Sequence, residues 1–182
     1  MNFLLYFGLL NCVFIPLAVY FLWSKNNYFN FFELPLTYSG TTHTKKPFIV
    51  LTCIGITIEL LFVMYLLNAF NLTTNNILMY FAAIGFLGIF ITALTPQGRP
   101  RLHRAGIRIM ITVMVFWSMY LHFLLFSVSS KIALLGTALS TICLFGVSYF
   151  YFFIKSKGYT ELFFIGIVLL WNILMTYLLI TN

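Results

Sequence analysis

The sequence contains no aspartate, and its acidic residues are Glu33, Glu59 and Glu161. Charged residues of both signs make up 7% of the 182 residues, which is too little polar surface for a water-soluble domain. The absence of aspartate excludes intramembrane aspartyl proteases and the zinc-dependent membrane hydrolases that need Asp together with several histidines. These shortages indicate a membrane protein rather than a soluble enzyme.

Cysteine and histidine are scarce as well. The cysteines are Cys12, Cys53 and Cys143. Each stands alone in an apolar segment, without the CxxC or Cys/His spacing of a zinc or iron–sulfur site. His122 lies within an apolar segment, whereas His43 and His103 are assigned to loops, which excludes a bis-histidine haem. We therefore predict no catalytic residue, no metal site and no cofactor.

Long apolar runs dominate the chain, which is 62% hydrophobic with a mean hydropathy of +1.03. A helix needs roughly 20 apolar residues to cross the hydrocarbon core of a bilayer. Six segments qualify, at residues 1–23, 47–67, 77–94, 107–128, 132–154 and 162–180. They predict an all-α integral membrane protein, a bundle of six transmembrane helices in which residues 1–182 form a single domain.

The basic residues predict how this bundle is oriented. Nine of the ten lie in or beside the loops after the first, third and fifth spans: Lys25, Lys45, Lys46, Arg99, Arg101, Arg104, Arg108, Lys155 and Lys157. Lys131 is alone on the other side. The positive-inside rule then places both termini on the non-cytoplasmic side, in a bacterial plasma membrane or an organellar inner membrane. The net charge of +7 faces anionic lipid, so we expect no nucleic-acid partner.

A cysteine introduced at Gly98 tests this orientation. We expect a membrane-impermeant thiol reagent to label it only after the membrane is opened, because the loop should lie inside. Labelling from outside in intact cells would reverse the predicted topology.

Four polar residues fall deep within the predicted spans: Asn11, Glu59, His122 and Asn172. Counted from the cytoplasmic ends, Asn11 and Glu59 lie about 18 Å deep, His122 about 22 Å and Asn172 about 15 Å. Polar groups in lipid are costly and usually face the bundle interior. One interpretation is a midplane site in which Glu59 and His122 pair, supported by the asparagines. The other is a polar staple between helices, with Ser118 satisfying His122 one turn away.

Arginines gather where the fourth span begins. Arg101, Arg104 and Arg108 share one helical face if Pro100 occupies the first helical position. Guanidinium groups beside helix N-terminal amides favour an anion, and the nearest abundant anion is a lipid phosphate. Simple orientation of the chain by cytoplasmic arginine is the alternative.

Small residues at helical spacing predict close helix packing. They are Gly55, Ala82, Gly85, Gly88, Gly136 and Ser140. Close backbone approach is the main way in which apolar helices pack in lipid.

The chain carries Ser39-Gly40 after the first span, and Pro96 followed by His103-Arg104-Ala105-Gly106 after the third. These motifs resemble the DRAM and Frag-related family of six-span membrane proteins and its uncharacterised bacterial relatives. The resemblance implies a lipid-linked or membrane-trafficking role without established chemistry. The chain departs from the family in lacking an acidic residue before the loop glycine. Charge also places the first loop inside, whereas animal members have it in the lumen.

These observations predict a non-enzymatic multi-pass membrane protein that binds lipid or a small amphipathic molecule. An accessory subunit of a large membrane complex, such as an energy-transducing one, is the first alternative. A small oligomeric transporter is the second. The expected partners are membrane lipids, and other subunits or further copies of the chain remain open.

Overall fold

Six long helices make up the computed structural model, which describes residues 3–25, 43–95 and 100–181. A short 3-10 helix, Phe3–Tyr6, leads into α1. The helices are α1 (Phe7–Ser24), α2 (Lys45–Ala69), α3 (Asn76–Leu94), α4 (Pro100–Leu125), α5 (Ser130–Tyr149, extended by a π-helical turn at Phe150–Ile154) and α6 (Lys157–Thr181). Each is long and apolar enough to cross a membrane. The predicted six-helix, all-α membrane architecture is confirmed for the described residues.

The largest difference from the predicted spans is at α4, which begins at Pro100 rather than at 107. Proline suits a first helical position and arginine is a good helix former, so the helix includes the basic segment that hydropathy assigns to a loop. His103 is therefore helical, and with 4% exposure it is buried. Its predicted loop position is wrong.

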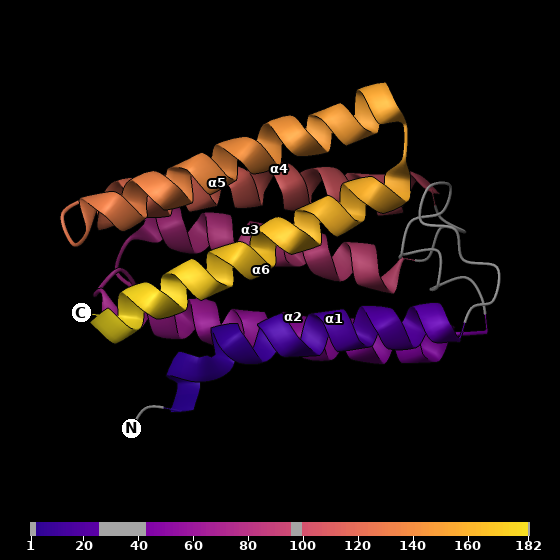
Figure 1. Ribbon diagram of the computed structural model, residues 1–182, viewed down its shortest axis with the longest axis horizontal. Coiled ribbons are helices and arrows are strands. Elements are labelled where there is room, and N and C mark those ends of the chain that lie inside the picture. The colour runs from indigo at the N-terminus through magenta and orange to yellow at the C-terminus, as the bar shows by residue number, and fades with distance from the viewer. Residues whose placement is uncertain (1–2, 26–42, 96–99, 182) are drawn as a thin grey trace.

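The helices alternate in direction, so the two termini lie at the same end of the bundle (Figure 1). Each helix packs against its neighbours in sequence, and α6 also packs against α1 and, less extensively, α2. In Figure 1, α6 crosses the front of the bundle between α5 and α1. In this position α6 packs against both α5 and α1 and so closes the bundle.

Close packing of α3 on α4 depends on glycine, as the small-residue spacing predicts. A Cβ atom added to Gly88 would lie 2.8 Å from the backbone nitrogen of Met110 and 3.1 Å from the carbonyl oxygen of Gly106. A Cβ atom on Gly85 would overlap Met114. The two backbones therefore approach each other where neither helix carries a side chain.

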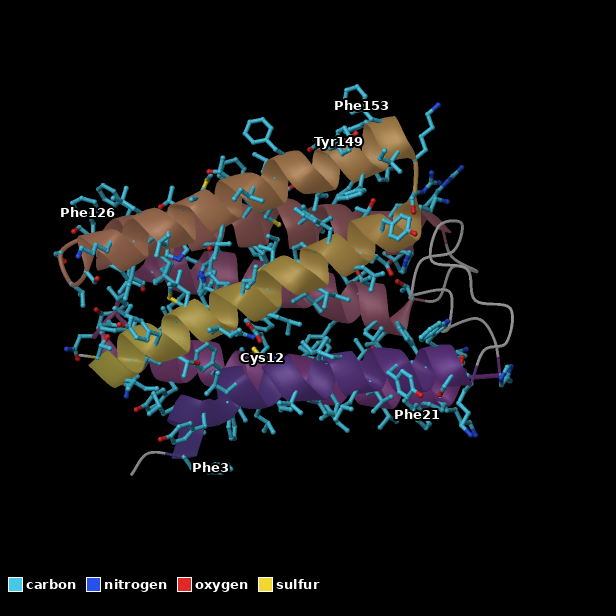
Figure 2. The ribbon with its side chains drawn as sticks, in the orientation of Figure 1. Phe3, Cys12, Phe21, Phe126, Tyr149 and Phe153 are labelled. Carbon is cyan, nitrogen blue, oxygen red and sulfur yellow. The ribbon has the colours of Figure 1, made fainter. Side chains whose placement is uncertain are left out.

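The outside of the bundle is apolar. Figure 2 shows Phe126, Tyr149 and Phe153 projecting outward, and Phe153 is 77% exposed. Such surfaces suit acyl chains rather than water. Which side the termini face stays a prediction from charge sorting. Arg99, Ser39-Gly40 and Pro96 lie outside the described residues.

Candidate functional site

Glu59 is the centre of a buried polar cluster that joins three helices. It lies in the middle part of α2, and its Oε2 atom accepts two hydrogen bonds. Asn11 Nδ2 of α1 donates at 2.6 Å, and Asn172 Nδ2 of α6 donates at 2.8 Å. Both asparagines are fully buried, and Glu59 is 9% exposed. The structure thus brings together three of the four predicted midplane residues.

Small residues let α6 approach α1 at this cluster. A Cβ atom on Gly8 would lie 2.6 Å from Thr176 Oγ1, so a larger residue at position 8 would push the helices apart. Gly8 precedes Asn11 by three residues, and Thr176 follows Asn172 by four, so both pairs share a helix face. Farther along the same interface, Cys12 Sγ lies 3.4 Å from the Leu169 carbonyl oxygen. This antiparallel contact fixes where Asn172 meets Glu59.

His122 belongs to a second polar cluster. Its Nε2 atom accepts a hydrogen bond from Trp171 Nε1 at 3.1 Å, so in a neutral ring Nδ1 carries the proton. Nδ1 faces Ser118 Oγ at 3.5 Å, and Ser140 of α5 donates to that same oxygen at 2.8 Å. A Cβ atom on Gly136 would overlap the imidazole, so His122 can pack against α5 only because position 136 is glycine.

The structure does not bring Glu59 and His122 together as a direct pair. Glu59 bonds to asparagines, whereas His122 bonds to Trp171 and Ser118. The chief packing partners of α2 are α1 and α3, and those of α4 are α3 and α5, so the two helices are not close neighbours. The two clusters adjoin on α6, where Trp171 and Asn172 are consecutive.

His122 also lies nearer a helix end than the depth count predicts. The count starts at Ile107, but α4 starts at Pro100 and ends at Leu125, three residues beyond His122. His122 therefore lies farther from the start of its helix than the count of about 22 Å assumes.

Several buried polar atoms have no hydrogen-bond partner among the described residues. They are Asn11 Oδ1, Asn172 Oδ1, Thr176 Oγ1, Trp117 Nε1 and His103 Nε2. The first two belong to the side chains that hold Glu59. The indole of Trp117 lies beside Trp171, with ring centroids 5.8 Å apart, and both tryptophans are buried inside the bundle.

Arg101, Arg104 and Arg108 line a recess of about 360 Å³ at the start of α4, together with Ala105. All three arginines are exposed, whereas His103 and Gly106 on the other face of the helix are buried. Within the described part of the chain, Arg101 and Arg108 make no hydrogen bond or ion pair. Among the described residues, the guanidinium groups of Arg101 and Arg108 therefore have donors available to a ligand.

A second recess, of about 440 Å³, lies along α6 and is wholly apolar. It is lined by Phe163, Gly166, Ile167, Leu169, Leu170 and Ile173. A Cβ atom on Gly166 would meet nothing within 4 Å, so glycine leaves this stretch of the helix open.

Sequence reasoning missed Thr176 and Gly8. The signal that could have found them is their spacing of one helical turn from Asn172 and Asn11 on helices expected to lie antiparallel. Ser140 was predicted as a small packing residue, and its hydroxyl in fact joins the His122 cluster.

No family model, curated protein or solved structure matches this chain. Function is therefore inferred from the residues themselves, and the family resemblance stays a prediction.

Proposed function

We propose that this multi-pass membrane protein binds anionic lipid, with the headgroup phosphate held in the recess lined by Arg101, Arg104 and Arg108. The observation that carries the proposal is this grouping of three exposed guanidinium groups around one hollow. Guanidinium matches the geometry of phosphate oxygens and forms paired, charge-assisted hydrogen bonds with them.

The position of the recess at the start of α4 adds a second source of attraction. The first backbone N–H groups of a helix have no partners within the helix, and they carry partial positive charge. An anion near Arg101 is thus favoured by both the arginines and the helix end.

A separate feature, the apolar recess on α6, suits an acyl chain. It lies within a candidate membrane span, where the surroundings are hydrocarbon. A hollow there is filled by acyl chains or by the apolar part of an amphipathic molecule.

Replacing the three arginines with glutamine should reduce binding of anionic lipid by about tenfold or more, since each charge-assisted hydrogen bond to phosphate contributes about 1.5 to 3 kcal/mol. Binding is measured on the protein in nanodiscs that contain either phosphatidylglycerol or only phosphatidylcholine. The matched control replaces Lys45, Lys46 and Lys157, three exposed cations of the same end of the bundle, with glutamine. It removes equal charge and should lose much less affinity.

A variant with lysine in place of all three arginines separates geometry from charge. It should lose part of the affinity, because lysine keeps the charge but cannot form the paired hydrogen bonds.

Unchanged lipid binding in a correctly inserted glutamine variant would refute the headgroup role. Equal loss of affinity when Lys45, Lys46 and Lys157 are replaced with glutamine would mean that the arginines act only through general charge attraction. Co-purification with other proteins at a fixed ratio in mild detergent would instead favour the complex-subunit alternative.

A further inference from the structure

The cluster around Glu59 has more hydrogen-bond acceptors than donors. Both asparagine Nδ2 groups donate to one carboxyl oxygen, Oε2. Asn11 Oδ1 and Asn172 Oδ1 accept nothing from the described residues, and Thr176 Oγ1 has no partner there either. Buried oxygens of this kind are normally satisfied, so the species that completes the cluster must supply positive charge or donors.

The oxygens lie close together. The amide oxygen and nitrogen of one side chain are about 2.3 Å apart, given C=O and C–N bonds of about 1.2 and 1.3 Å. Each asparagine Oδ1 is therefore within about 5 Å of Glu59 Oε2. Thr176 lies one turn beyond Asn172 on α6 and contacts α1 at Gly8. The side chains around Glu59 thus contribute buried oxygen atoms from three helices.

Within the described part of the chain, no side chain forms an ion pair with Glu59, and the nearest basic residue along α2 is Lys46, about 20 Å away along the helix axis. An isolated carboxylate in a low-dielectric interior is very costly unless a positive charge accompanies it.

We propose that Glu59, Asn11, Asn172 and Thr176 form a binding site for one small monovalent cation, with sodium as the representative ion. Carboxylate, amide and hydroxyl oxygens are hard ligands that suit alkali and alkaline-earth ions rather than transition metals. A single carboxylate balances a single positive charge, which favours a monovalent ion over calcium. The inference is independent of lipid binding at the arginines, because the two sites share no residue.

The test is thermal unfolding of the purified protein in detergent, in sodium chloride and in choline chloride at equal ionic strength. Sodium should raise the melting temperature by several degrees, since a ligand that binds only the folded state stabilises it. Acidification should reduce the shift, because protons compete for the carboxylate. Binding of radioactive sodium to the same preparation reports occupancy directly.

Glu59→Gln is the decisive variant. Its carbonyl oxygen can still accept from both asparagines and its amide group can donate to an asparagine oxygen, so the fold should persist while the charge is lost. The sodium-specific shift should disappear. The matched control is Glu161→Gln, which removes the other described acidic residue and should keep the shift. Thr176→Val removes one oxygen at nearly constant volume and should weaken sodium affinity about tenfold.

Two results would overturn the proposal. One is a wild-type protein that neither binds sodium nor is stabilised by it relative to choline, which would mean that a proton or water completes the cluster. The other is a sodium effect of equal size in wild type and in both Glu59→Gln and Thr176→Val, which would place the ion elsewhere.

Discussion

Replacing Gly88 with alanine should destabilise the protein by about 3 kcal/mol. The added Cβ atom would lie 2.8 Å from Met110 N, 2.9 Å from Ile109 Cγ2 and 3.1 Å from the Gly106 carbonyl oxygen. Two of these atoms belong to the backbone of α4, which cannot turn aside as a flexible side chain can. The helices must separate, and the contacts along α3 and α4 weaken together. Equilibrium unfolding in mixed micelles of increasing denaturing-detergent content measures the change.

Gly166→Ala is the matched control for this prediction. A Cβ atom there would meet nothing within 4 Å, so the substitution should be neutral or stabilise α6 by up to about 1 kcal/mol through helix propensity. Gly55→Ala should fall between the two, because its Cβ atom would make ordinary contacts with Phe14 from 3.5 Å. Similar stabilities for Gly88→Ala and Gly166→Ala would contradict the close approach of α3 and α4.

Hydropathy predicts the six helices well because a membrane span is specified by length and apolar content alone. It fails at the start of α4, where arginines are counted as loop although they continue the helix from Pro100. The proline at position 100 and the spacing of the arginines do predict a helix in that region. The turn-by-turn placement of Arg101, Arg104 and Arg108 on one face follows from helical periodicity once the helix begins at Pro100.

Depth along a span predicts the Glu59 cluster in part. Asn11, Glu59 and Asn172 lie at similar heights on helices that alternate in direction, and the structure brings them into contact. Height does not say which helices are neighbours, nor which way each helix is rotated. Those two properties depend on side-chain packing, for example on Gly8 against Thr176 and on Gly136 against His122. This is why the partner of Glu59 is an asparagine pair and not His122.

Glu59→Leu should destabilise the protein by about 2 to 5 kcal/mol, because it leaves the amide group of Asn172 buried without an acceptor and leaves Asn11 only its 3.4 Å bond to the Gly55 carbonyl oxygen. Adding Asn172→Leu should cost less than the two single changes combined, with a coupling of about 1 to 3 kcal/mol, since the second change removes one of the stranded groups. His122→Leu alone should also destabilise, by about 1 to 3 kcal/mol, because it strands the indole N–H of Trp171.

The pairing of Glu59→Leu with His122→Leu distinguishes the two arrangements of the polar core. In the structure these side chains share no hydrogen-bond partner, so their effects should add to within about 0.5 kcal/mol. A direct Glu59–His122 pair would instead produce strong coupling between them and weaker coupling between Glu59 and Asn172. Both cycles can be measured with the same unfolding assay. If the coupling between Glu59 and His122 exceeds that between Glu59 and Asn172, the division into two clusters is wrong. The reverse order supports two separate clusters, with α6 contributing Asn172 to one and Trp171 to the other.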